Sequence, residues 1–318
     1  MAHDDRLFLK AIRQHCERNG IAVELLAEGW LVMMRQGRQQ HLAFGYDLGI
    51  NSAVAHRIAN DKSATAEMLA LAGVPAIPHR LFLNPKSKEH VPSPESWDTM
   101  LRLLDQNPAG LVVKPNEGTA GRSVFRVLSR PQLEAAVAEI SSLGMAIAIA
   151  PYVEIEEEVR VILLDDAPLV VYAKRRPSVV GDGKHSLLEL ATAAVPEQRS
   201  ALLAGSFEDL DRTEFDAIVP AGEQRLLNWR HNLDAGARPV LLDHGETREI
   251  CVRTAVDAAR AINIHFASID LVRTGGDWKV LEINSGVMME ELGKLYPDVV
   301  CAAYGAALDR IFNTELPR

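Results

Sequence analysis

The chain has few cysteines and no long apolar run, and each of these absences excludes a class of protein. Its 3 cysteines are scattered with no CxxC pair, which argues against a disulfide-stapled secreted domain and against a zinc or redox site. No run of 18 apolar residues and no apolar leader at MAHDDRLFLKAIRQ is present, so we expect no membrane segment. A net charge of −9 argues against a general nucleic-acid binder. With 318 residues, 47% of them hydrophobic, the chain is long enough for two or three subdomains.

Several familiar motifs are also missing. The strings GxxxxGK[ST] and GxGxxG do not occur, which leaves a P-loop NTPase or a Rossmann dinucleotide site without local support. No G-x-S-x-G elbow and no Cys/His protease signature is present either. The chemistry of this chain must therefore be sought in other patterns.

A candidate metal site lies near the C-terminal end, in the segment VLEINSGVMM (280–289). Side chains of a strand alternate, so Glu282 and Asn284 share one face while Leu281 and Ile283 point toward a core. Carboxylate and amide oxygens on one face are ligands that suit Mg²⁺. The alternative is an ordinary hairpin with solvated acids.

A second strand candidate, FASIDLV (266–272), brings a further carboxylate to the same place. The turn residues Gly275, Gly276 and Asp277 indicate a hairpin. With a three-residue loop, Thr274 pairs with Trp278 and Asp270 falls opposite Glu282. We therefore expect Asp270, Glu282 and Asn284 to form one hard-oxygen metal site.

Two lysines lie where phosphate-binding groups are often found. LVVKPNEGTAGRSV (111–124) reads as an apolar strand that ends at Lys114, followed by a loop containing Gly118, Thr119, Gly121 and Ser123. Glycines let backbone N–H groups approach phosphate oxygens, although such a loop is by itself more often a plain turn. Lys62 stands at the start of a predicted helix over residues 60–72, capped by Asn60 or Asp61 and ended by Gly73 and Pro75.

The order of these motifs resembles a known superfamily. Lys62 before a helix and "AGVP", then VVKPNEGTAGRSV, PYVEIEEEVRVILLDD, SIDLV and LEINSG look like ATP-grasp enzymes. Within that superfamily the chain is similar to cyanophycin synthetase, through KRRPSVVGDGKHSLLEL (174–190), and to the glutathione-forming module of bifunctional glutathione synthetases. The likeness covers essentially the whole chain. It implies an α+β ATP-grasp fold with a reduced N-terminal lobe (1–60), a small subdomain (61–150) and a large subdomain (151–318).

The resemblance also implies an activity. Such enzymes hold ATP between two α+β subdomains with Mg²⁺ or Mn²⁺, phosphorylate a carboxylate, and let an amine displace phosphate to form an amide. We therefore expect a cytoplasmic ligase with small-molecule carboxylate and amine substrates, with a homodimer left open. Two alternatives also stay open, namely a nucleotide-binding regulatory protein that has lost turnover and an ATP-grasp phosphotransferase.

Roles for individual residues follow from the same resemblance. Pro151, Tyr152 and Val153 resemble the hinge beside the adenine, and Glu158 resembles the acid that binds the ribose. Relatives often carry Glu or Gln where this chain has Ala150, so the contact to the adenine amino group departs from the pattern. The expected contacts to the ATP phosphates are Lys62, Lys114, Asn116, Glu117, Gly118, Thr119, Gly121 and Ser123.

The acyl substrate and the transferring phosphate are expected to meet arginines. By the resemblance, Arg160 and Arg175 have catalytic roles, because a planar guanidinium donates two parallel hydrogen bonds to developing charge. The expected substrate contacts are Arg230, Asn232, Ser285 and Gly286. The alternative for the arginines is an ordinary surface position.

Overall fold

The computed structural model describes residues 6–84, 95–118, 123–194, 214–227, 231–233 and 236–313. The chain divides into two compact units, one formed by Tyr172–Leu242 and the other by Met1–Val171 together with Asp243–Arg318. Helices and mainly antiparallel sheets alternate along it, which confirms the predicted α+β class. In the part of the chain that the structure describes, no helix is both long and apolar enough to cross a membrane. The division into lobes at residues 60 and 150 stays a prediction.

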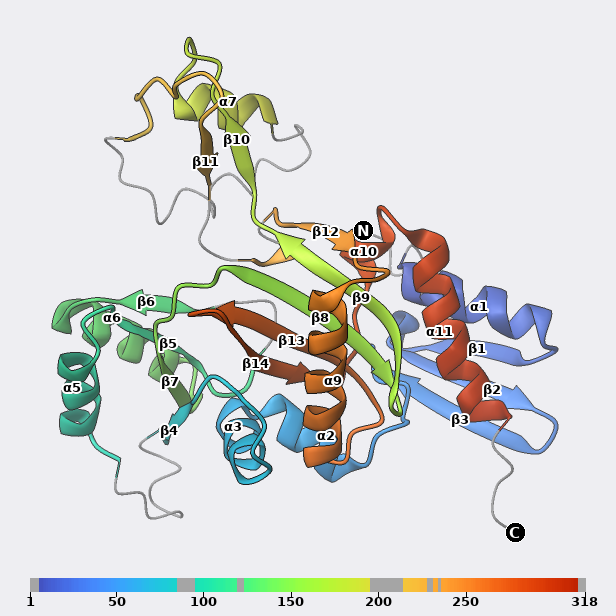
Figure 1. Ribbon diagram of the computed structural model, residues 1–318. Helices are drawn as coiled ribbons and strands as arrows, with labels where there is room; N and C mark the ends of the chain where they lie inside the picture. The colour runs from blue at the N-terminus through green and yellow to red at the C-terminus, as the bar shows by residue number, and fades with distance from the viewer. Residues whose placement is uncertain are drawn as a thin grey trace. The chain divides into compact units, whose positions relative to one another are not determined.

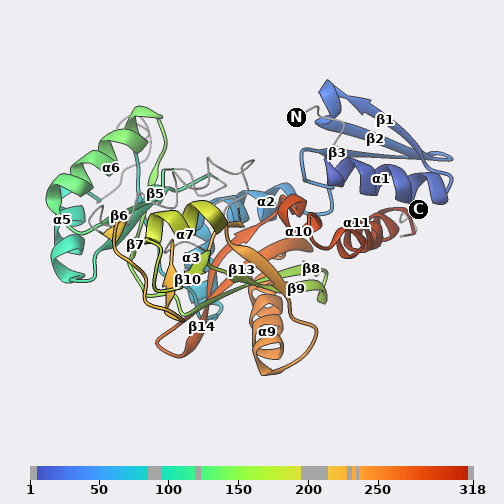
Figure 2. The ribbon, with the colours of Figure 1, turned by 90° about the horizontal axis from the view of Figure 1, so that it is seen from above.

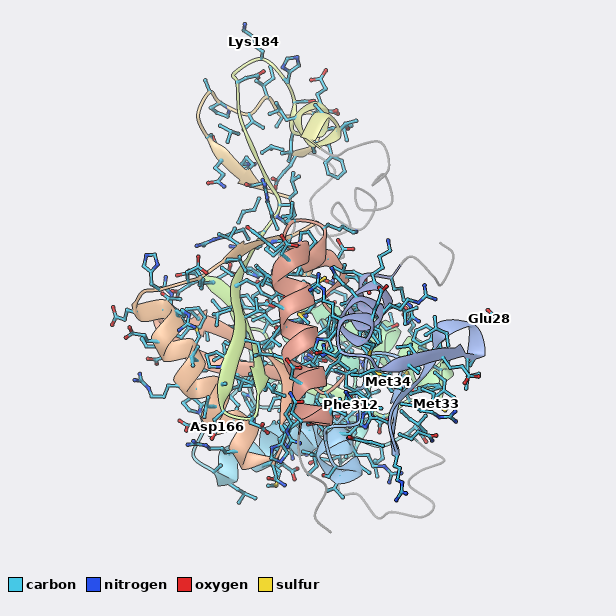
Figure 3. The ribbon with its side chains drawn as sticks, turned by 90° about the vertical axis from the view of Figure 1, so that its right-hand side faces the viewer. Glu28, Met33, Met34, Asp166, Lys184 and Phe312 are labelled. Atoms are coloured by element: carbon cyan, nitrogen blue, oxygen red, sulfur yellow. The ribbon has the colours of Figure 1, made fainter. Side chains whose placement is uncertain are left out.

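A small antiparallel sheet near the N-terminus packs with helices from both ends of the chain (Figure 1). Its elements are α1 (Leu7–Arg18), β1 (Ala22–Leu26), the 3-10 turn η2 (Ala27–Gly29), β2 (Leu31–Gln36), β3 (Gln39–Phe44) and α11 (Pro297–Phe312). Consecutive residues of β2 point to opposite faces, so Met34 is fully buried while Met33 is half-buried (Figure 3). The hairpin between β2 and β3 turns at Gly37, whose φ of 59° is left-handed and favours glycine.

A second sheet, in the order β4-β7-β5-β6, presents two chemically different faces. Its elements are β4 (Arg80–Phe82), α5 (Trp97–Gln106), β5 (Leu111–Pro115), β6 (Phe125–Val127), α6 (Arg130–Ser142) and β7 (Ile147–Pro151). Val113 and Ile149 share a buried core with Met100 of α5 and Leu133 of α6, and the two helices cover that face (Figure 2). Because side chains alternate, Lys114 lies on the opposite face.

The larger unit also holds a long sheet in which β9, β8, β13 and β14 are neighbours. The strands and the helices near them are β8 (Glu157–Leu164), β9 (Ala167–Arg175), β13 (Phe266–Thr274), β14 (Asp277–Asn284), α2 (Ala53–Asn60), α3 (Lys62–Leu71), α9 (Glu246–Ala261) and α10 (Glu290–Gly293). Asp61 separates α2 from α3, and its carboxylate accepts a hydrogen bond from the Ala64 amide at 2.8 Å. Of the two predicted caps, Asp61 is therefore the one used.

The hairpin between β13 and β14 corrects one prediction. Its loop is only two residues, Gly275 and Gly276, so Thr274 pairs with Asp277 rather than with Trp278. Both glycines have positive φ, as a tight hairpin turn requires. The predicted three-residue loop is therefore wrong.

A β-bulge at Leu281 offsets that error. Leu271 pairs with Val280 and Asp270 pairs with Glu282, which leaves Leu281 as the extra residue. Leu281 packs against the apolar cluster that contains Val272, which lies on the same face of β13 as Asp270. The predicted pairing of Asp270 with Glu282 is confirmed, but it depends on this bulge, which the sequence pattern did not predict.

The second unit is built on the last residues of β9. Tyr172–Arg175 pair with β12 (Arg238–Leu241), and β10 (Ser178–Val180) pairs with β11 (Gln224–Leu226) in a separate two-stranded antiparallel sheet. The helix α7 (Leu187–Ala194) covers a small core that includes Val179, Leu187 and Val219. This unit contains the segment 174–190.

Candidate functional site

Three charged residues lie side by side across β8, β13 and β14. Arg160 pairs in register with Asp270, which pairs with Glu282 on its other side. The Arg160 guanidinium donates two hydrogen bonds of 2.6 Å to the two carboxylate oxygens of Asp270, whose exposed fraction is only 1%. Such a bidentate pair fixes both side chains. On β14, the Asn284 amide nitrogen donates to Glu282 at 3.1 Å.

These residues suit a divalent cation. Asp270, Glu282 and Asn284 offer two carboxylates and an amide oxygen on one sheet face, which is a hard-oxygen donor set for Mg²⁺. A carboxylate has about four lone-pair positions, so Asp270 retains acceptor capacity beyond its two bonds to Arg160. Across the described ranges, no group of three or more His, Cys, Asp or Glu side chains is arranged for metal binding. The predicted metal site therefore needs the amide oxygen of Asn284 as its third ligand.

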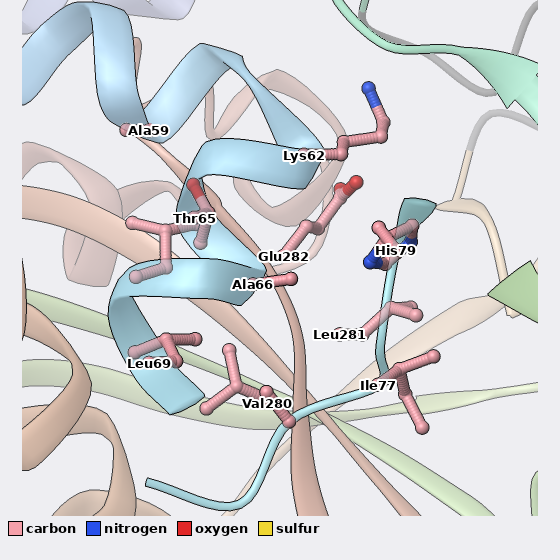
Figure 4. A pocket seen from close by; sticks show the side chains of 12 residues that line it. Ala59, Lys62, Thr65, Ala66, Leu69, Ile77, His79, Val280, Leu281 and Glu282 are labelled. Atoms are coloured by element: carbon pink, nitrogen blue, oxygen red, sulfur yellow. The ribbon is translucent and has the colours of Figure 1, made fainter. Parts of the chain in front are cut away.

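The two predicted lysines both come close to Glu282. Lys114 is buried, and burial lowers its pKa to about 8, an effect that Lys62 strengthens and that Glu282 and Glu158 oppose. Burial also lowers the pKa of Lys62, against the opposing charges of Glu282, Asp61 and Glu117. Figure 4 shows Lys62 and Glu282 on the two sides of a small cavity between α3 and β14. The cleft thus gathers two ammonium groups and two carboxylates.

Asn116 ties the start of the Gly-rich loop to α3. Its Oδ1 accepts hydrogen bonds from the Ser63 amide at 3.1 Å and the Ser63 hydroxyl at 2.7 Å. Lys62 Nζ donates to the backbone carbonyls of Asn116 and Gly118, at 3.3 and 3.1 Å. The structure therefore gives Asn116 an anchoring function, in addition to the phosphate contact that was predicted for it.

The remaining loop residues are only partly described. Glu117 is exposed and close enough to raise the pKa of Lys62. At the far end of the loop, the Ser123 hydroxyl donates to Glu139 at 2.9 Å. Thr119 and Gly121 lie outside the described residues.

An apolar cluster lies beside the predicted hinge. Ile77, Ala150 and Val272 are buried together, with Val153, Ile155 and Leu281 packed against them. The hinge residue Tyr152 is fixed by its backbone amide, which donates to the Gly110 carbonyl at 3.0 Å, and by Arg126, which lies 3.7 Å from its ring centroid. Pro151 ends β7. An apolar cluster close to the lysines and to Glu158 is chemically suited to a nucleotide.

Ser285 meets residues from the N-terminal part of the chain. It is fully buried, and its hydroxyl lies 2.9 Å from His56 Nδ1. Asp47 Oδ2 is 3.3 Å from the same nitrogen, so the hydroxyl and the carboxylate both approach Nδ1 of the imidazole. A Cβ on Gly286 would reach to 4.0 Å from the Cβ of Tyr46. Sequence reasoning singled out Ser285 and Gly286, whose substrate contacts stay predictions, but not Asp47 and His56, which no motif marks.

The second unit carries the other predicted substrate residues. Arg175 is exposed at the end of β9, whereas its neighbour Lys174 is buried. Burial, with Arg176, Lys174 and Arg175, lowers the pKa of the buried His231 to about 3. Asn232 follows His231, and Arg230 lies outside the described residues. This cluster of positive charge was only partly predicted.

His79 is a buried polar residue of the larger unit that sequence reasoning did not single out. It lines the same cavity as Lys62 and Glu282 (Figure 4). The signal that could have identified it is weak, because a lone histidine after a proline matches no motif.

Comparisons with known proteins identify the fold. No protein-family profile and no curated relative matches the chain. It is similar to the bifunctional glutathione synthetase from Pasteurella multocida, with a TM-score of 0.56 and 17% identity over 96% of this chain and 45% of that one. The chain thus spans less than half the length of that synthetase.

A second likeness is to D-alanine–D-alanine ligase from Bacillus anthracis, with a TM-score of 0.53 and 17% identity over 83% of this chain and 69% of that one. The complex of that ligase with ATP gives a TM-score of 0.52 and 16% identity, covering 83% and 68%. At these identities the likeness concerns the fold, and it agrees with the motifs found in the sequence: the chain has the ATP-grasp fold.

Proposed function

We propose that this protein is an ATP-dependent carboxylate–amine ligase. A substrate carboxylate oxygen attacks the γ-phosphorus of ATP, ADP leaves, and an acyl phosphate forms. An amine nitrogen then attacks the acyl carbon and loses a proton, and phosphate leaves as the amide forms. Amino acids or small peptides are the proposed substrates, and the cytoplasm, which supplies ATP, is the proposed compartment.

The observation that carries the proposal is the closeness of Lys62 and Lys114 to each other and to Glu282. Lys62 and Lys114 both have lowered pKa values, because burial and, for Lys114, the charge of Lys62 disfavour the ammonium form. An anion bound between the two lysines would stabilise both ammonium groups. The apolar cluster around Ile77 and Leu281 offers a surface for a base beside these charges. Phosphates and a flat base are the two halves of a nucleotide.

Asp270, Glu282 and Asn284 would hold Mg²⁺ or Mn²⁺, which when bound neutralises charge on the β- and γ-phosphates. Arg160 of β8 lies beside these proposed metal ligands, because its guanidinium is fixed by two hydrogen bonds to Asp270. A preorganised donor of this kind stabilises charge that develops on a transferring group. Arg160 is therefore assigned to the phosphoryl group rather than to the base.

The substrate groups are assigned by charge. Asp47 and Ser285, which share His56, offer an anion and a hydroxyl that suit an amine with its positive charge. In the second unit, Arg175, Arg176 and Lys174 suit a carboxylate. The assignment of Arg230 and Asn232 to the acyl substrate stays a prediction from the resemblance.

A product assay tests the proposal. The purified protein is incubated with ATP, Mg²⁺ and a pool of amino acids and small peptides, with Glu282→Gln as the matched control. Release of ADP and phosphate with a new amide mass supports a ligase. Release of AMP overturns the acyl-phosphate route, and a phosphorylated product without an amide shows a phosphotransferase. Binding of ATP with no product from any acceptor indicates the regulatory alternative.

A further inference from the structure

His79 belongs to the cleft face of the second sheet. It immediately precedes β4, in which Arg80 pairs with Ile149 of β7, so the antiparallel register places His79 beside Ala150. Ala150 shares its face with Ala148, which pairs with Lys114. His79 therefore lies on the face that carries Lys114 and not on the face that packs against α5 and α6.

The imidazole has one nitrogen in use and one without a partner. Its exposed fraction is 9%, and Nε2 makes no hydrogen bond with any described group. The ring's hydrogen bond to the Ile77 backbone must then run through Nδ1, which donates to the carbonyl. Burial, with Lys114 and Lys62, lowers the pKa of His79 well below its usual range, so the ring is neutral. A neutral ring with its proton on Nδ1 leaves Nε2 as a hydrogen-bond acceptor.

An unpaired buried acceptor at this position selects for a donor. A buried polar atom without a partner costs free energy, which a ligand that supplies an N–H recovers. Ile77 lies two residues before His79, and Ala150 lies beside His79 on the neighbouring strand. Both residues belong to the apolar cluster beside the hinge. The complementary ligand is a flat apolar ring with an amino group at its edge.

We propose that His79 is a specificity-determining residue whose Nε2 accepts a hydrogen bond from the exocyclic amino group of adenine. This inference rests on the proposed ATP site, and it adds the residue by which that site would select adenine over other purines. A purine with an oxygen at the same place brings a second acceptor toward the lone pair and is disfavoured. The alternative donor to Nε2 is a single water molecule, for which the cavity of about 10 Å³ has room.

Nucleotide binding measured by calorimetry separates these possibilities. The nucleotides are ATP, ITP and purine riboside triphosphate, which lacks any exocyclic group. His79→Phe keeps a flat ring but has no lone pair, and His79→Gln restores an acceptor. The exposed His185 of the second unit gives the control, His185→Phe.

We expect His79→Phe to weaken ATP binding about tenfold, the effect of one hydrogen bond, while binding of purine riboside triphosphate is unchanged. His79→Gln and His185→Phe keep the preference for ATP over both analogues. An unchanged preference in His79→Phe, or an equal loss for all three nucleotides, overturns the inference and leaves the ATP site standing. If the unmodified protein binds none of them, the proposed function itself fails. Should His79→Phe not give a cooperative thermal transition, His79→Leu is measured in its place.

Discussion

Asp270 and Glu282 face each other across β13 and β14 because a bulge at Leu281 compensates for a turn one residue shorter than the sequence suggests. The bulge places Leu281 on the same face as the two carboxylates, where it packs against Val272 and Ile77. One irregular residue thus puts the carboxylates and the apolar surface into a single cleft. Bulges next to active sites often re-aim side chains in this way.

The first prediction concerns the carboxylate pair. Glu282→Gln should lower Mg²⁺-dependent ATP turnover by roughly a hundredfold, because it removes a charged ligand without changing the size of the side chain. Circular dichroism and thermal unfolding should match the unmodified protein, since Glu282 is not buried. Full turnover of Glu282→Gln at limiting Mg²⁺ would sink the assignment. Exposed Glu24 gives the control variant, Glu24→Gln.

A second prediction follows from the lowered pKa of Lys114. The folded-state pKa is about 8 and the ordinary value is 10.5, so between these values the unfolded chain binds more protons than the folded one. Stability of the nucleotide-free protein should therefore rise with pH across this window, by on the order of 3 kcal/mol from this group. The slope should disappear in Lys114→Met and persist in Lys184→Met, which changes an exposed lysine. Denaturant unfolding at pH 8 and pH 10 measures it.

The same group should take up a proton when ATP binds. Phosphate charge favours the ammonium form, so at pH 8.5 binding should be accompanied by net proton uptake. Calorimetry in two buffers of different ionisation enthalpy measures the uptake. An identical value in Lys114→Met would mean that another group is responsible.

Much of this architecture was readable from the sequence, and the exceptions share a physical cause. The strand candidate FASIDLV and the cap at Asp61 are local patterns, and the structure confirms the elements that they predicted. The turn at Gly275 failed because two-residue and three-residue loops use the same residue types, and the bulge leaves no trace in a pattern of alternation. His79, Asp47 and His56 could not be found, because each acquires its neighbours through pairing of segments far apart in the chain.

Asn116 gives a third prediction, about anchoring. Asn116→Ala should lower the free energy of unfolding by about 1–3 kcal/mol, since it leaves the buried amide and hydroxyl of Ser63 without their acceptor. ATP affinity should fall as well, because Lys62 is aligned by the Asn116 and Gly118 carbonyls. The exposed Asn19, whose side chain donates to the His15 carbonyl one turn earlier, gives the control Asn19→Ala. Unchanged stability in Asn116→Ala would contradict the anchoring function.

The last prediction separates the two arginines for which catalytic roles are proposed, Arg160 and Arg175. Arg160→Ala removes the bidentate partner of the buried Asp270 carboxylate and should destabilise the protein by about 3–5 kcal/mol. Arg175 is exposed, so Arg175→Ala should change stability by no more than about 0.5 kcal/mol. Lower activity of Arg160→Ala could therefore come from its lower stability. Arg160→Lys, which keeps the positive charge but not the planar guanidinium, is the better variant for kinetics.

Arg175→Ala has no such complication, so its effect on function can be read directly. If it binds the acyl substrate or its phosphate, turnover should fall roughly a hundredfold while ATP affinity stays close to that of the unmodified protein. Lys114→Ala should show the opposite order, with ATP affinity lost first. Calorimetry with ATP and steady-state ADP release give the two values for each variant. An Arg175→Ala protein whose ATP affinity collapses as far as that of Lys114→Ala would move Arg175 into the nucleotide site and overturn its assignment to the substrate.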